Sequence, residues 1–169
     1  SVMASAANRT RAPMSDALWK LKMEGDTSHL QPIAETVASF IRSKAELADI
    51  AAVVPVPPSD TGRVLQPVIA VAQAAAGILC LPCPSDYLIK TKQTVLIRTT
   101  PDRQSARKEL EGAFHIKDGR FAGRHILLLD DVFRSGETLS AACRAVRSEG
   151  KVARISALTL TWIAPVWER

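Results

Sequence analysis

The spacing of apolar residues divides the chain into strands and helices. Residues 126–129 (Ile-Leu-Leu-Leu) form an unbroken apolar run, which is typical of a strand buried on both faces of a parallel sheet. We expect a neighbouring strand at 114–116 to pair with it across the turn at 117–123. Further apolar runs predict strands at 51–56, 78–81 and 152–160. Apolar residues at helical spacing predict helices that begin near Met14, Pro32, Val64 and just after Gly136. The second of these is expected to bury Ile33, Val37, Phe40 and Ile41 on one face.

Strands and helices alternate after the first two helices. This order predicts an α/β fold, with a mainly parallel central sheet flanked by helices and an N-terminal helical pair. We expect residues 1–13 to be a flexible N-terminus and residues 14–169 to form a single domain. Within it, residues 14–45 would be the helical N-terminal part, and residues 51–161 the core sheet and helices.

Two acids follow the longest predicted strand, at the carboxyl edge where open α/β sheets bind ligands. Asp130 and Asp131 are succeeded by a turn with Ser135, Gly136 and Thr138, and then by a helix. A helix N-terminus with nearby hydroxyls favours an anion, and Gly136 lets the backbone approach it closely. The two carboxylates would repel a phosphate and should instead accept hydrogen bonds, as from the hydroxyls of a ribose. The stretch therefore predicts a site for a 5-phosphoribosyl group.

Residues 126–139 resemble the 5-phosphoribosyl-1-pyrophosphate (PRPP) motif of type I phosphoribosyltransferases. In that motif a hydrophobic strand is followed by two acids, two hydrophobic residues, a small residue, Ser or Thr, Gly, any residue and Thr. Residues 16–22 and 107–114 are similar to segments of the ComF group of competence-associated phosphoribosyltransferase-like proteins, but the cysteine-rich zinc finger that usually begins those proteins is missing. Arg134 departs from the motif, which has a small residue there, and Glu137 adds a negative charge that we expect to point to solvent.

The resemblance implies transfer of the phosphoribosyl group from PRPP to a nitrogen acceptor, with release of pyrophosphate. The catalytic residues would be Asp130 and Asp131, which help to stabilise a cation-like transition state by position and charge. The expected ribose and 5-phosphate residues are Asp130, Asp131, Val132, Phe133, Arg134, Ser135, Gly136, Glu137 and Thr138. The expected pyrophosphate residues are Ser59, Gly62, Arg63, Lys90, Lys92 and Arg107. Magnesium (Mg2+) is expected on the oxygens of the substrate, with no direct protein ligand.

A second function class stays open beside the enzyme. It is a non-catalytic PRPP-sensing or nucleic-acid-associated module that keeps the pocket, since the ComF group is linked to DNA uptake and repair. Residues 90–124 carry nine basic and four acidic groups, which accounts for the whole net charge of +5, and this excess would serve either the substrate or nucleic acid. A nucleotide hydrolase is disfavoured because the chain lacks a G-x-x-x-x-G-K-[ST] loop.

The remaining features concern the setting of the protein. The chain of 169 residues has no apolar run of membrane-span length and no signal peptide, so we expect a cytoplasmic location and no membrane partner. Cys80 and Cys83 have redox or zinc spacing, but no second pair follows, and free thiols are favoured. The polar stretch from Lys90 to Arg103 is expected to be a long loop that covers a site. The acceptor and the assembly stay open, with a homodimer as one alternative.

Overall fold

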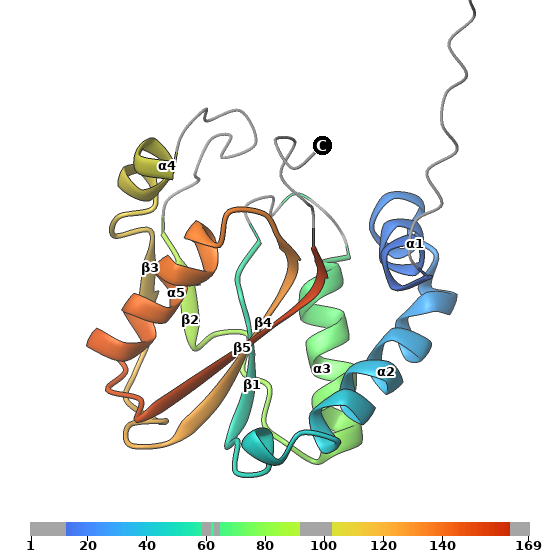
Figure 1. Cartoon of the computed structure of the whole chain (residues 1–169), viewed down its shortest axis with the longest axis horizontal. Helices are drawn as coiled ribbons and strands as arrows, with labels where there is room; N and C mark the ends of the chain where they lie inside the picture. The colour runs from blue at the N-terminus through green and yellow to red at the C-terminus, as the bar shows by residue number, and fades with distance from the viewer. Residues whose placement is uncertain (1–12, 59–61, 63–64, 92–102, 163–169) are drawn as a thin grey trace, which may run out of the picture.

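A parallel sheet of three strands lies at the centre of the molecule (Figure 1). The computed structural model describes residues 13–58, 62, 65–91 and 103–162. The strands of the sheet, in the order β1-β4-β5, are β1 (Ala52–Pro55), β4 (His125–Phe133) and β5 (Arg154–Trp162). β4 is the middle strand, with Val54 and Ala157 on either side of Leu128. The predicted α/β fold, with its parallel sheet flanked by helices and its N-terminal helical pair, is confirmed.

Helices and a second, antiparallel sheet surround the central sheet (Figure 1). The other elements are α1 (Pro13–Trp19), a π-helical turn (Lys20–Glu24), 3-10 turns (Thr27–His29 and Ala45–Leu47), α2 (Leu30–Arg42), α3 (Pro67–Leu79), β2 (Leu88–Lys90), α4 (Arg103–Glu109), β3 (Phe114–Ile116) and α5 (Glu137–Ser148). No helix among the described residues is both long and apolar enough to cross a membrane. Residues 1–12, most of the predicted flexible N-terminus, lie outside the described ranges.

Alternate residues of β4 build a hydrophobic core on each face of the central sheet. Ile126 and Leu128 pack into the cluster formed with α5, β2 and β3, whereas Leu127 and Leu129 pack into the cluster formed with α2 and α3. All four side chains are fully buried. Burial on both faces explains why this strand is apolar without alternation, as expected for a strand inside a parallel sheet.

The helices on one face differ from the prediction in a single large side chain. α2 packs on α3 and buries Ile33, Val37 and Ile41, as predicted. Phe40 was predicted on the same buried face and is instead 43% exposed, so that prediction is wrong. The buried stripe of α2 is centred toward Ala34, which leaves Phe40 at its outer border.

The apolar run 78–81, predicted as a strand, belongs to the end of a helix, so this prediction is wrong. Ile78 lies in the last turn of α3, and Cys80 ends the helix with a φ of 55°. The backbone N–H of Leu81 then donates to the carbonyl of Ala76 at 2.9 Å. α3 is apolar on nearly all sides, and hydropathy alone does not separate such a helix from a buried strand.

The predicted pairing of residues 114–116 with the strand at 125–130 is also wrong. β3 pairs with β2 in an antiparallel sheet, with Leu88 opposite Ile116, while β1 and β5 occupy both edges of β4. After β3 the chain is tied to the start of β2 through Asp86, whose carboxylate lies 2.6 Å from Lys117 Nζ and 3.1 Å from Arg120 Nη1. The turn between β3 and β4 therefore joins two sheets and not two paired strands.

A buried histidine anchors the amino end of β4. Nδ1 of His125 lies 2.7 Å from Oδ1 of Asp49, and its Nε2 lies 2.9 Å from Oγ of Ser156. Arg154 also donates to the carboxylate of Asp49. These polar groups are paired with one another, so they stabilise the amino edge of the sheet. The predicted ligand residues gather at the opposite, carboxyl edge.

Candidate functional site

The two acids at the carboxyl end of β4 leave the strand on opposite faces. Successive side chains of a strand alternate, so Asp130 continues the face of Leu128 and Asp131 the face of Leu129. The backbone N–H of Asp131 donates to Oδ1 of Asp130 at 2.8 Å, which fixes one carboxylate against the strand. The acids are therefore adjacent in sequence but have different surroundings.

Asp131 forms an ion pair with a lysine from the N-terminal part of the chain. Lys22 Nζ donates to Oδ2 of Asp131 at 2.5 Å, and both side chains are about three-quarters buried, at 25% and 23% exposed. Lys22 lies in the π-helical turn that follows α1, and Gly25 ends this turn with a φ of 70°. The main-chain oxygen of Asp131 accepts a hydrogen bond of 3.0 Å from Thr161 Oγ1 of β5. Sequence reasoning assigned no role to Lys22, because nothing local links it to a residue 109 positions away.

Asp130 is an acid whose protonation changes near neutral pH. Burial, and then the charge of Asp131, raise the pKa of Asp130 from 3.8 to about 7. Lys90 in β2 lies close enough for electrostatic interaction with Asp130; burial lowers the pKa of Lys90, and the carboxylate of Asp130 partly offsets this. The ammonium group also lies 5.5 Å from the centre of the Phe114 ring. The structure thus brings Lys90 and Asp130 together on the α5 side of the sheet.

The turn after β4 presents backbone N–H groups at the start of α5. Gly136 is the N-cap residue, and its φ of 78° lies in the left-handed region that favours glycine. A Cβ atom at this position would come within 2.9 Å of the Phe133 ring, so the turn also needs glycine for space. The carbonyl of Gly136 accepts the first helical hydrogen bond, from the N–H of Ser140 at 2.8 Å. The N–H groups of Thr138 and Leu139 precede that bond and point out of the helix tip, as in known anion sites.

The two departures from the motif have different surroundings. Arg134 is exposed and leaves the turn open to a ligand. Glu137, which was expected to point to solvent, is half-buried and lines a groove on the flank of α5. Thr138 is the second residue of the helix, after Glu137, and the cap position belongs to Gly136.

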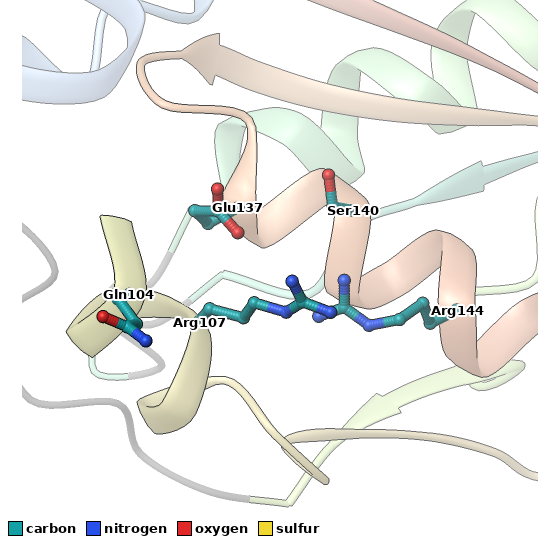
Figure 2. A pocket seen from close by; sticks show the side chains of 5 residues that line it. All are labelled: Gln104, Arg107, Glu137, Ser140 and Arg144. Carbon is teal, nitrogen blue, oxygen red and sulfur yellow. The ribbon is translucent and has the colours of Figure 1, made fainter. Parts of the chain in front are cut away.

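The groove on the flank of α5 lies between that helix and α4, with a volume of about 430 Å³. Figure 2 shows the side chains that line it, with the guanidinium groups of Arg107 and Arg144 pointing toward one another across it. Gln104 and Arg107 come from α4, and Glu137, Ser140 and Arg144 come from α5. Sequence reasoning proposed Arg107 as a phosphate ligand but missed Arg144. Arg144 follows Glu137 by seven residues, which places both side chains on one side of a helix. This spacing in the sequence could have indicated that Arg144 shares a surface with Glu137.

The described residues include potential metal ligands and three thiols. No group of three His, Cys, Asp or Glu side chains there comes together in a way that could hold a metal ion. Cys80, Cys83 and Cys143 are free, and burial raises the pKa of the Cys83 thiol to about 11. A reactive cysteine needs a lowered pKa, so Cys83 behaves as a packed thiol and not as half of a redox pair.

Known proteins share both the fold and part of the sequence. No family model matches the chain. Over 86 residues it is 34% identical to competence protein ComFC of Bacillus subtilis (strain 168), a match that covers 48% of this chain and 33% of that protein. The solved adenine phosphoribosyltransferase from Leishmania tarentolae superposes with a TM-score of 0.50 at 15% identity, over 83% of this chain and 62% of the other. The chain has the phosphoribosyltransferase fold. A solved allosteric regulatory enzyme of purine biosynthesis gives a TM-score of 0.51 at 14% identity, over 77% of this chain and 26% of that enzyme.

The predicted likeness to ComF-like phosphoribosyltransferase-domain proteins is thereby confirmed at the level of fold and partial sequence similarity. The chain spans about a third of the curated relative and about a quarter of the purine-biosynthesis enzyme. The activities of those whole proteins therefore bear on this chain only as proposals.

Within this phosphoribosyltransferase fold, the predicted phosphate-turn residues lie together and the predicted pyrophosphate residues are only partly described. Residues 130–138 form one continuous strand end, turn and helix start. Of the six pyrophosphate candidates, the described ones are Gly62, which is exposed, Lys90 beside Asp130, and Arg107 in the groove. Ser59, Arg63 and Lys92 lie outside the described residues, as does most of the predicted loop, at 92–102.

Proposed function

We propose that the protein binds PRPP and transfers its phosphoribosyl group to a nitrogen acceptor, releasing pyrophosphate. The observation that carries this proposal is one continuous segment at the carboxyl edge of a phosphoribosyltransferase fold. There the buried part of β4 is followed by Asp130 and Asp131, and the turn after Phe133 passes through Gly136 into the first N–H groups of α5. Acceptors for hydroxyl groups and donors for a phosphate thus lie one turn apart.

The 5-phosphate would bind at the tip of α5. Its oxygens would accept from the backbone N–H groups of Thr138 and Leu139, and from the hydroxyls of Ser135 and Thr138, which are half-buried. Gly136 supports this because a larger residue would push against Phe133 and close the turn. The exposed Arg134 offers a guanidinium group above the turn.

The ribose hydroxyls would donate to the two carboxylates. Asp130 must be ionised to accept from a hydroxyl with both oxygens, and with a pKa of about 7 it is largely ionised above neutral pH. Asp131 would share its carboxylate between the ribose and Lys22, whose ammonium group holds it in place. Lys22 would thus be a positioning residue for the ribose site.

The chemical step would be displacement at C1 of the ribose. The C1–O bond to pyrophosphate breaks with its electron pair on the leaving group, the C1–N bond to the acceptor forms, and the acceptor nitrogen gives up a proton. The negative charge of Asp130 would stabilise positive charge on the ring, and Lys90 and Arg107, with Ser59, Gly62, Arg63 and Lys92, would contact the pyrophosphate. Magnesium on the substrate oxygens would neutralise the leaving group, with Asp130 and Asp131 accepting hydrogen bonds from its waters.

The proposal includes a cytoplasmic location, supported by three cysteines that are all free thiols. It leaves the acceptor base unassigned. Trp162 at the carboxyl end of β5 is 61% exposed and pairs with Phe133 of β4, so its ring could stack on a base near the ribose acids.

The test is binding and turnover with one variant and a matched control. We expect the wild-type protein to bind PRPP with magnesium in calorimetry and to release pyrophosphate with at least one base of a nucleobase panel. Asp130→Asn should weaken binding about tenfold or more, because a hydrogen bond to a charged group is lost. Asp16→Asn is the control: it removes an exposed acid that pairs with Lys20 at 3.0 Å, and it should leave binding unchanged. Failure of the wild-type protein to bind PRPP would refute the proposal.

A non-catalytic PRPP-sensing or nucleic-acid-associated module is the second candidate. The observation that favours it is the ion pair of Lys22 with Asp131, which engages one of the two acids that turnover would use. PRPP binding without pyrophosphate release for any base would identify a sensing module. Binding of single-stranded DNA that falls with salt, by a log–log slope of about −0.7 per phosphate contacted, would identify a nucleic-acid role.

A further inference from the structure

The groove between α4 and α5 brings two arginines together. Arg107 and Arg144 project into it from the two helices, and their guanidinium groups point toward one another (Figure 2). Within the described part of the chain, neither of them makes an ion pair or a side-chain hydrogen bond. By contrast, aspartates hold Arg120 and Arg154. Two facing cations repel one another unless an anion lies between them.

We propose that this groove is a second phosphate site, separate from the turn at the tip of α5, and that its ligand carries linked phosphate groups. A guanidinium group presents N–H donors in a planar fork that matches two oxygens of a phosphate. Two such forks from different helices bind one phosphate from both sides. Gln104 and Ser140 add an amide and a hydroxyl as neutral donors on the same walls.

The size and charge of the groove favour a ligand longer than a single phosphate. Its volume of about 430 Å³ is in the range of small-molecule sites. Arg144 follows Glu137 by seven residues, which places their Cα atoms about 10 Å apart along the helix. Two guanidinium groups face one carboxylate, that of Glu137, so the described lining is positive overall. Because Glu137 begins α5, its charge lies at the end of the groove near the phosphate turn and repels phosphates least at the Arg144 end.

The groove and the phosphate turn use different parts of the same helix. The turn offers backbone N–H groups that point along the axis beyond Gly136, whereas the groove offers side chains on the flank. A phosphate at the turn therefore leaves the groove donors available, and only Arg107 is shared, since the proposed function also assigns it to the pyrophosphate of PRPP. This second site does not depend on PRPP turnover, and it can be tested apart from the proposed function.

The experiment measures binding of inorganic tripolyphosphate to the full chain by calorimetry, without metal and at fixed salt. We expect Arg144→Gln to weaken this binding about tenfold or more, since a charge-assisted pair of hydrogen bonds is lost. Arg147→Gln is the matched control, because Arg147 lies on the same helix, is exposed and does not line the groove. It should bind tripolyphosphate as the wild-type protein does. Ribose 5-phosphate, which would occupy the turn, should bind equally to all three proteins and should not displace tripolyphosphate.

The result that would overturn this inference is tripolyphosphate affinity that is the same in Arg144→Gln as in the wild-type protein, or no binding by the wild-type protein. Full competition between ribose 5-phosphate and tripolyphosphate would also overturn it, because the two would then share the turn.

A parallel titration with a short oligothymidylate separates the sources of linked phosphates. Weaker oligothymidylate binding in Arg144→Gln would assign the groove to a nucleic-acid strand, and unchanged binding would assign it to a small oligophosphate. If ribose 5-phosphate fails to bind while tripolyphosphate binding still depends on Arg144, the proposed function fails and the groove stands.

Discussion

Replacing Asp130 with asparagine should weaken ligand binding and at the same time stabilise the protein without ligand at alkaline pH. The carboxyl group is largely buried beside another acid, and its pKa rises from 3.8 to about 7. An acid with a raised pKa binds its proton more tightly in the folded state than in the unfolded one. The folded state therefore loses stability as the pH rises between these two values. Above about pH 7 the protein carries the full cost of a buried charge.

The magnitude follows from the size of the shift. About three pKa units correspond to about 4 kcal/mol of unfolding free energy, since each unit is worth about 1.4 kcal/mol. This figure is an upper limit, because water reaches part of the side chain. Asparagine has nearly the same shape and carries no charge, and its amide oxygen can still accept from the N–H of Asp131. The variant should therefore exceed the wild-type protein by clearly more at about pH 8 than at about pH 5, because most of the pH-dependent loss of the wild type falls between these two values.

Urea denaturation of the two proteins, followed by tryptophan fluorescence at both pH values, checks this expectation. Asp16→Asn serves as the control, because its carboxylate is exposed in an i,i+4 pair. A stability difference between wild type and Asp130→Asn that is the same at both pH values would refute the assignment of the raised pKa to Asp130. PRPP affinity of the wild-type protein should rise with pH through about 7, as the carboxylate ionises.

Three further substitutions test the ribose site and the turn. Thr138→Val should weaken ribose 5-phosphate binding about tenfold by calorimetry, with little change in melting temperature because Gly136 and not Thr138 is the cap residue. Gly136→Ala should lower the unfolding free energy by about 1–2 kcal/mol, measured in urea, because alanine is strained at this φ and meets the Phe133 ring; Phe133→Leu should restore part of it. Lys22→Met should lower the unfolding free energy, measured in urea, by about 1 kcal/mol through the lost pair with Asp131, and an equal loss when Asp131 is already asparagine would contradict this reasoning.

The features that the sequence predicted well are those that form from neighbouring residues. The strand 126–129, the acids, the turn with Gly136 and the helix after it follow one another along the chain, and each has its own local signature. A buried parallel strand is apolar on both sides, and a left-handed N-cap needs glycine. For this reason the amino-acid sequence alone is enough to place the phosphate turn, whereas the contacts of the turn to a ligand stay a prediction.

The errors arose where distant parts of the chain decide the outcome. An apolar run at 78–81 fits a strand or a buried helix equally well, and packing of α3 against α2 and the central sheet selects the helix. The pairing of β3 depended on β2, for which no strand was predicted and whose last residue, Lys90, begins the predicted loop. Neighbouring strands in sequence pair more often than not, yet here the edges of β4 were taken by β1 and β5.

The two acids of the motif show how far tertiary contacts change a local pattern. In the sequence Asp130 and Asp131 are equivalent, and both were assigned to one ribose. In the structure the alternation of β4 sends them to opposite faces, where Lys22 holds Asp131 and burial raises the pKa of Asp130 to about 7. One acid is then held in an ion pair while the other gains or loses a proton near neutral pH. Because the ion pair of Asp131 depends on a π-helical turn 109 residues earlier in the chain, a shorter fragment that begins after α2 would lose this pair even with the motif intact.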